Sequence, residues 1–158
     1  MVVLAITDSS DAPRLLREAR QDAGMTQRAL AEAAGIQQSH IAAIESGKRK
    51  VSAELLTRIL RAAGYRPSIP LEREADAIRE IARENGLDGV RVFGSTIRGQ
   101  DGFDSDVDLL VDIVRPDVPF GLPSFIAQVE DLIRFPVDVV VDDGSGISPI
   151  VRDETVPL

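Results

Sequence analysis

Hydrophobic residues along the first 65 positions recur every three or four residues, and each such run ends at a glycine. That spacing places the apolar side chains on one face of an α-helix. Glycine is the residue that most readily takes the left-handed conformation at a helix end, and threonine or serine suits a helix start. The pattern therefore predicts four helices, over residues 10–24, 26–35, 37–46 and 52–64.

Beyond position 70 the pattern alternates between helical spacing and the short apolar runs that are typical of strands. Three helices are expected there, over residues 71–84, 124–133 and 148–156. Three strands are expected at residues 90–93, 106–113 and 137–141. The preceding residues 66–70 include two prolines and are interpreted as a short, stiff linker.

These elements predict two domains with different fold classes. Residues 1–67, with a core at 12–65, are expected to form an all-α helix-turn-helix bundle, because a short glycine-containing turn joins the second and third helices. Residues 71–158 are expected to form a small α/β (α+β) fold with a short mixed sheet.

The charges divide at the same place. The first 70 residues carry ten Lys or Arg and seven Asp or Glu, net +3, whereas the remainder carries eight and 19, net −11. The whole-chain charge of −8 argues against nucleic-acid binding, but the basic first half is compatible with it. The asymmetry indicates two modules with different partners.

Other features of the composition exclude several kinds of site and classes of protein. The chain has no cysteine, so it has neither a disulfide framework nor a thiolate metal site. No apolar run approaches the ~20 residues of a membrane span. The apolar residues 1–6 lack the basic start and the length of a signal peptide. A cytoplasmic protein is expected, and residues 1–9 could be a strand, a dimerisation arm or a frayed end.

Two aspartates stand two positions apart where the second strand begins. Asp106 and Asp108 would project from one face of an extended segment, where two carboxylates repel unless a hard cation accepts their oxygens. Ahead of them, Gly94 permits close approach of a ligand, and Ser95 with the amides after it can contact phosphate. The combination indicates a nucleotide site with a bound metal. The alternative is the solvated face of an edge strand.

Gly94-Ser95, ten further residues and then Asp-Val-Asp resemble the minimal nucleotidyltransferase family of the polymerase-beta-like superfamily. The resemblance implies Mg²⁺ (or Mn²⁺) as the cofactor and ATP as the substrate. The implied catalytic and metal-binding residues are Asp106, Asp108 and Asp138. The implied nucleotide-binding residues are Gly94, Ser95 and Arg98. For Arg98, a role in holding the loop stays open beside contact with phosphate.

Residues 15–60 resemble the Cro/C1-type (phage repressor-like) DNA-binding family. The match is carried by Met25-Thr26-Gln27, Leu30-Ala31, Gly35-Ile36 and residues 41–48. It implies operator DNA as a partner, bound by a homodimer, and an internal salt bridge between Arg20 and Glu45. The implied DNA-binding residues are Gln27, Gln37, Gln38, Ser39, Ala43, Lys48, Arg49 and Lys50. Gln38 is the strongest base reader, because a glutamine amide can pair bidentately with adenine.

Members of the minimal nucleotidyltransferase family are typically antitoxins paired with a HEPN-type ribonuclease toxin, and some adenylylate that toxin. The resemblance therefore implies a two-domain antitoxin that represses its own operon and transfers AMP to a toxin. Two alternatives stay open. The second domain could neutralise the toxin by contact alone with a silent metal site, or it could be the nucleotide sensor of a transcription regulator.

Overall fold

The computed structural model describes residues 9–142 and 154–158. Its first part, residues 9–66, contains only helices and turns and is called the helical region. It begins with a single 3-10 turn, η1 (Ser9–Asp11). The helices that follow are α1 (Ala12–Asp22), α2 (Gln27–Ala34), α3 (Gln38–Glu45) and α4 (Ala53–Ala62). The four helices predicted from the sequence are confirmed, each within a few residues of its expected ends.

Local contacts explain where these helices begin and end. The Thr26 hydroxyl accepts a hydrogen bond from the Ala29 amide at 3.1 Å and so caps the start of α2. Gly35 then ends α2 with φ of 67°, a left-handed conformation that turns the chain sharply into α3. Helix α1 packs against both α3 and α4. The result is the predicted helix-turn-helix arrangement, with α2 and α3 in contact.

The second part, residues 75–142 and 154–158, is called the sheet region. Its elements are α6 (Ala75–Glu84), β1 (Leu87–Phe93), β2 (Val107–Ile113), α7 (Gly121–Ile133), β3 (Val137–Val141) and β4 (Val156–Pro157). The strands form one sheet in the order β3-β2-β1-β4. β2 and β3 are parallel, whereas β1 is antiparallel to both of its neighbours. The predicted short mixed sheet is therefore confirmed.

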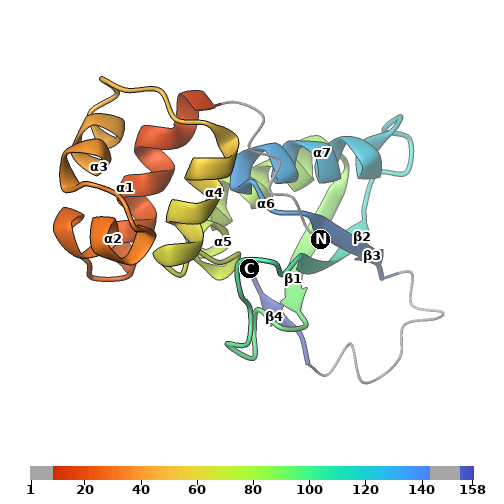
Figure 1. Cartoon of the computed structure of the whole chain (residues 1–158). Helices are drawn as coiled ribbons and strands as arrows, with labels where there is room; N and C mark the ends of the chain where they lie inside the picture. The colour runs from red at the N-terminus through yellow and green to blue at the C-terminus, as the bar shows by residue number, and fades with distance from the viewer. Residues whose placement is uncertain (1–8, 143–153) are drawn as a thin grey trace.

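Helices cover one face of this sheet (Figure 1). Helix α6 contacts β1, α7 contacts β3, and the two helices contact each other. Val107, Leu109 and Val111, alternate residues of β2, are fully buried in the core. Since successive side chains of a strand point to opposite faces, Asp108 lies on the other face of the sheet from these three residues.

Between the two regions the structure corrects the expectation of a linker. Residues 68–73 form a helix, α5 (Ser68–Arg73), with Pro67 at its N-cap and Pro70 in its first turn. Proline is tolerated there because the first amides of a helix have no intrahelical acceptor. Ile69 and Leu71 of this helix are buried in the core. The segment is therefore packed rather than a spacer.

The end of the chain also differs from the prediction. Of the helix expected over residues 148–156, residues 148–153 lie outside the described part of the chain. Val156 belongs to β4, where it pairs with Val92 of β1. A two-residue edge strand has no periodicity that could be recognised in the sequence. Residues 1–8, whose role stayed open, also lie outside the described part.

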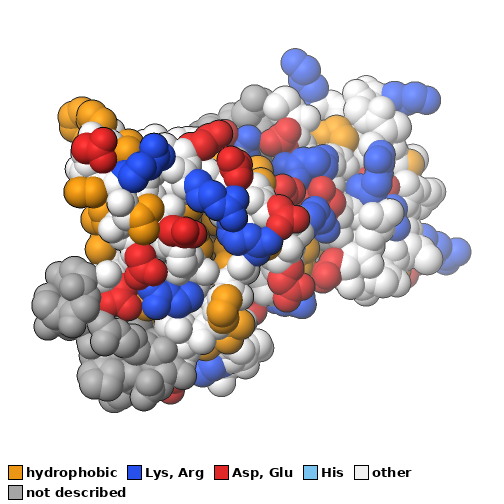
Figure 2. Space-filling model, turned by 180° about the vertical axis from the view of Figure 1, so that it is seen from behind, with side chains coloured by type: hydrophobic (Ala, Val, Ile, Leu, Met, Phe, Trp, Pro, Cys, Tyr) orange, Lys and Arg blue, Asp and Glu red, His pale blue; other side chains and the backbone are white. Residues whose placement is uncertain are grey.

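Figure 2 shows one face of the molecule, on which Lys and Arg side chains project from the end formed by the helical region. Acidic and basic side chains are mixed over the middle of that face. Where the two regions meet, Arg134 pairs with Asp11 of η1 at 2.9 Å, and Arg73 of α5 pairs with Glu18 of α1 at 2.5 Å. Among the helices of residues 9–142 and 154–158, none is long and apolar enough to cross a membrane.

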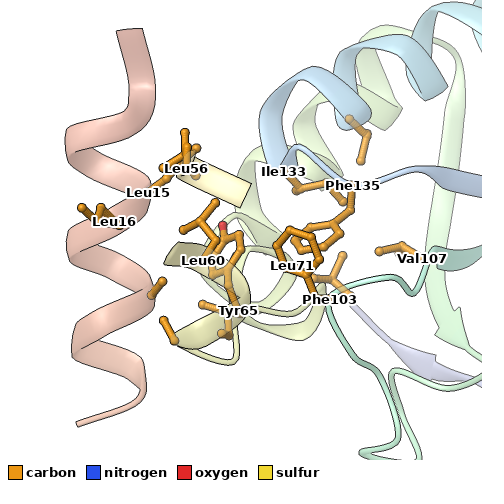
Figure 3. Packing of buried hydrophobic residues seen from close by; sticks show 14 of the residues in the cluster. Leu15, Leu16, Leu56, Leu60, Tyr65, Leu71, Phe103, Val107, Ile133 and Phe135 are labelled. Atoms are coloured by element: carbon orange, nitrogen blue, oxygen red, sulfur yellow. The ribbon is translucent and has the colours of Figure 1, made fainter. Parts of the chain in front are cut away.

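One hydrophobic core runs through both regions (Figure 3). At the junction, the Tyr65 and Phe135 rings lie 5.5 Å apart between centroids, and Phe103 meets Phe135 edge-on at 6.5 Å. Tyr65 is completely buried, and Phe135 and Leu71 are almost so. These aromatic contacts join the end of the helical region to the start of β3.

Candidate functional site

Three carboxylates gather at one end of the sheet, on the face that α6 and α7 do not cover. Asp108 of β2 and Asp138 of β3 are direct neighbours in the parallel register. Asp106 immediately precedes β2, two positions before Asp108. The structure therefore brings together the three aspartates that were predicted to be catalytic.

The three carboxylates interact electrostatically at Asp108. Burial raises the pKa of its carboxyl, the negative charges of Asp106 and Asp138 raise it further, and the charge of Arg98 partly opposes them. Carboxylates that repel one another in this way form a site where a divalent cation would relieve the repulsion. Oxygen ligands also suit Mg²⁺ by their chemistry.

The donor set thus fits a magnesium ion, but it is not a closed cage. Within residues 9–142 and 154–158, no three carboxylate or imidazole side chains are arranged to hold a metal ion as they stand. Mg²⁺ sites in nucleotide-binding proteins commonly take one or two carboxylates together with substrate phosphates and water. The metal therefore stays a prediction from donor chemistry.

Gly94 lies directly against this carboxylate cluster. Its φ of 77° is left-handed, and a Cβ at this position would lie 2.1 Å from Oδ2 of Asp108. No other residue fits there without displacing that carboxylate. Immediately afterwards the chain closes a turn, in which the Gln100 amide donates to the Ser95 carbonyl at 3.0 Å. Gly94 is thus held against Asp108, and Ser95 follows it as the first residue of the turn.

Arg98, at the tip of this turn, contacts both its own loop and the end of the chain. Its Nε donates to Oε1 of Gln100 at 3.4 Å, and its guanidinium lies 3.5 Å from the Glu154 carboxylate. Its positive charge also lowers the pKa of Asp108. The structure is therefore compatible with both roles considered for Arg98.

Sequence reasoning missed the residues that hold the far side of the loop between β1 and β2. Arg61 of α4 pairs with Asp104, and the amide of Ser68 donates to Asp101. The members of these pairs are 43 and 33 positions apart. Neither pair lies in a motif, so no local signal could have found them.

A second group of predicted residues gathers around the start of α3. Gln37 occupies the N-cap position of α3 without a capping hydrogen bond from its side chain, and Gln38 and Ser39 are exposed in the first turn. Ala43 is half-buried further along α3. In the segment after α3, three cationic side chains are exposed: Lys48, Arg49 and Lys50. The predicted DNA-binding residues outside α2 thus lie on α3 and the segment that follows it.

A hydrogen bond to the neighbouring helix orients the side chain of Gln38. Its Nε2 donates to Oε1 of Gln27 at 3.0 Å, and Gln27 in turn donates to the Glu45 carboxylate at 2.9 Å. Glu45 is 4% exposed and also accepts two hydrogen bonds from Arg20, at 2.6 and 3.1 Å. The salt bridge expected between Arg20 and Glu45 is confirmed. A chain of contacts therefore runs from the buried ion pair to the exposed amide of Gln38.

Comparison with known proteins assigns each of the two regions to a domain family. Residues 16–69 match the helix-turn-helix family model, and residues 75–156 match the nucleotidyltransferase domain model. The chain is 37% identical over 83 residues to protein adenylyltransferase MntA of Thermococcus cleftensis, which covers 49% of this chain and 81% of that protein.

A solved structure described as a minimal nucleotidyltransferase gives a TM-score of 0.52 at 30% identity. The similarity covers 60% of this chain and 98% of the other. The nucleotidyltransferase model alone spans more than half of the sequence. The chain therefore carries a helix-turn-helix region and belongs to the nucleotidyltransferase domain family.

Proposed function

We propose that this chain is an antitoxin that represses its own operon and neutralises a toxin by transferring AMP from ATP to it. The carboxylate cluster, with Gly94 packed against Asp108, is the observation that carries the transferase half of the proposal. The exposed amide of Gln38 and the cations after α3 support the repressor half. The antitoxin role itself rests on the family resemblance.

In the transferase reaction, an acceptor hydroxyl oxygen bonds to the α-phosphorus of ATP while the bond to pyrophosphate breaks. Asp138 is proposed to receive the hydroxyl proton. Gly94 and Ser95 position the β- and γ-phosphates, with Arg98 at the tip of the turn. Asp106, Asp108 and Asp138 would hold Mg²⁺ (or Mn²⁺), which when bound offsets the negative charge of the phosphates and the departing pyrophosphate.

A protein side chain is the proposed acceptor. The relative from Thermococcus cleftensis is named a protein adenylyltransferase, which supports a protein as the acceptor here. The family resemblance makes a HEPN-type ribonuclease the proposed recipient.

Operator DNA is the proposed partner of the helical region. The α3 residues would enter the major groove, where Gln38 reads a base and Gln27 contacts a phosphate. Lys48, Arg49 and Lys50 would add further phosphate contacts. A homodimer would place two copies of α3 on half-sites about one helical turn apart.

Incubating the chain and the toxin encoded beside it with ATP labelled in its α-phosphate, in the presence of Mg²⁺, tests the proposal. Label on the toxin that is lost with Asp108→Asn supports transfer. Neutralisation of the toxin without label would contradict transfer and favour inhibition by contact alone. Nucleotide-dependent operator binding with no effect on any toxin would favour a regulator that senses nucleotide.

A further inference from the structure

The loop between β1 and β2 carries residues of the proposed transferase site at both ends. Gly94, Ser95 and Arg98 stand at its start, and Asp106 ends it. The part in between has no helix or strand of its own. Ordering such a segment costs conformational entropy for every residue that is fixed. The site therefore depends on whatever contacts hold the loop.

Some of those contacts come from outside the sheet region. Arg61, in the last turn of α4, makes a two-pronged ion pair with Asp104, with nitrogen–oxygen distances of 2.5 and 2.8 Å. The same guanidinium lies over the Phe103 ring, 4.6 Å from its centroid. Phe103 is 8% exposed and packs edge-on against Phe135. One side chain of the helical region thus holds two consecutive residues of the loop.

A second contact fixes the neighbouring part of the loop. The backbone amide of Ser68, at the start of α5, donates to Oδ2 of Asp101 at 2.8 Å. Within the loop, the Gly102 amide donates to Oγ of Ser105 at 2.9 Å, and the Ser105 amide donates back to the Gly102 carbonyl at 3.0 Å. This closed turn ends one residue before Asp106. A displacement of the turn would therefore move Asp106.

We propose that Arg61 is a positioning residue of the transferase site, which it reaches through Asp104 and Phe103. The helical region is then a working part of the transferase as well as a DNA-binding element. The proposal rests on the transferase function proposed above. The guanidinium is suited to this role because its planar fork pairs with a carboxylate while its face stacks on an aromatic ring. Lysine offers only a point charge on a flexible stem.

Exposure limits what this contact contributes to overall stability. The Arg61 and Asp104 side chains are 54% and 52% exposed, and ion pairs of that exposure contribute little to the folding equilibrium. Their effect is expected on the loop instead. A misplacement of about 1 Å at a reacting group can reduce the rate about a hundredfold, which makes the transferase reaction a sensitive readout of loop position.

The test compares Arg61→Ala and Arg61→Lys with Arg73→Ala in the full-length chain. Arg73 is a matched control, because its ion pair with Glu18 joins α5 to α1 without touching the loop. The charge-swapped pair Arg61→Asp with Asp104→Arg tests whether the contact itself matters. The readouts are hydrogen exchange of the peptide covering residues 95–106 and kcat and KM for MgATP.

Arg61→Ala is expected to raise exchange in residues 95–106 and to lower kcat/KM by about tenfold or more, with Arg61→Lys in between and partial recovery in the charge swap. Arg73→Ala should change neither readout. Loop exchange in Arg61→Ala equal to that of Arg73→Ala overturns the proposal, whether or not the chain is active. A wild-type chain without transferase activity would contradict the proposed function. Hydrogen exchange in residues 95–106 would then still test whether Arg61 positions the loop.

Discussion

Glu45 shows how a single buried residue connects the stability of the fold to the proposed DNA-binding surface. Burial by itself would raise the pKa of this carboxyl, but hydrogen bonds from Arg20 and Gln27 and the charges of Arg20 and Arg17 together outweigh burial and lower it. The Glu45 backbone carbonyl also accepts a hydrogen bond from Arg17 at 2.8 Å. Two arginines of α1 and the first residue of α2 therefore converge on the end of α3.

Replacing Arg20 by alanine should lower the free energy of unfolding by about 3 kcal/mol, because the Glu45 carboxylate would be left buried without its main partner. Urea unfolding at neutral pH measures this. Arg28→Ala removes an exposed pair with Glu32 and should cost less than about 1 kcal/mol. Equal effects of the two substitutions would show that burial of Glu45 adds nothing.

The same ion pair should make stability depend on pH in the acid range. The pKa of Glu45 is lower in the folded chain than in the unfolded chain. Its contribution is therefore fully present above the ordinary carboxyl pKa and is lost as the pH falls through the lowered folded value. Arg20→Ala should reduce this acid-range loss of stability.

Asp108 should behave in the opposite way, since its pKa is raised in the folded state. Its protonation stabilises the fold fully below the ordinary carboxyl range, and that contribution is lost as the pH rises through the raised folded value. Asp108→Asn should thus slightly stabilise the chain at pH 7, by less than about 1 kcal/mol after solvent screening, while transfer is abolished.

Thermal unfolding in the presence of a chelator measures this gain. Asp117→Asn, at an exposed position in the loop before α7, is the control for removing one negative charge. An Asp108→Asn chain that is less stable than wild type, without any added metal, would contradict the repulsion among the three aspartates.

At the scale of elements, helices and strands could be predicted wherever nearby residues determine where they begin and end. The threonine cap of α2 and the glycine that ends it are both readable from the sequence and both hold in the structure. The spacing from Gly94 to Asp108 could likewise be recognised, because the two strands on either side of the loop place the ends of that motif together. The spacing of the motif therefore predicts the two paired strands, and the paired strands explain the spacing.

Elements that depend on distant packing could not be predicted. The prolines of residues 66–70 indicate a linker, yet α5 tolerates one at its N-cap and the other in its first turn, and it is stabilised by burial of Ile69 and Leu71. β4 exists because it pairs with β1. The sequence of two residues carries no pattern from which that pairing could be predicted. Arg61 carries no motif, and its partner is 43 positions away.

Helix α3 supplies a prediction about operator recognition. Gln38→Ala should weaken binding to the operator by about 1–3 kcal/mol and leave binding to random DNA nearly unchanged. Gln27→Ala should also weaken operator binding, because Gln27 accepts the hydrogen bond that orients Gln38. Gln21→Ala, exposed at the end of α1, is the matched control.

Titrations of operator and random DNA at two salt concentrations measure these effects. Affinity for both DNAs should fall steeply with salt, because cations of the helical region replace counterions on the phosphates. Equal losses on both DNAs in Gln38→Ala would assign this residue to the backbone rather than to a base.

At the scale of the whole molecule, the packing between the two regions determines where the acidic residues lie relative to bound DNA. The 88 residues from 71 onward carry a net charge of −11, and α5 together with the aromatic contacts holds this acidic part against the helical region. It cannot swing away from an operator as it could on a flexible linker. If the proposed function holds, a toxin bound to this acidic part would reduce its repulsion from the DNA.

A toxin with a basic surface that docks on the acidic part should tighten operator binding. Linkage then requires the operator to tighten toxin binding by the same factor. Titrating the neighbouring toxin into an operator-binding assay, and operator into a toxin-binding assay, measures both sides of this coupling. Operator affinity that is unchanged at every toxin ratio would leave two independent activities on one chain.

The contact between Tyr65 and Phe135 also affects events during synthesis of the chain. Phe135 leaves the ribosome about 70 residues after Tyr65, a delay of several seconds at ~5–20 residues per second. During that time the end of the helical region lacks the partner that covers Tyr65 in the finished molecule. Ribosome-bound chains arrested before Phe135 emerges should be cleaved near Tyr65 by added protease, and longer ones protected. A newly made chain would then complete the packing of its helical region only together with that of its sheet region.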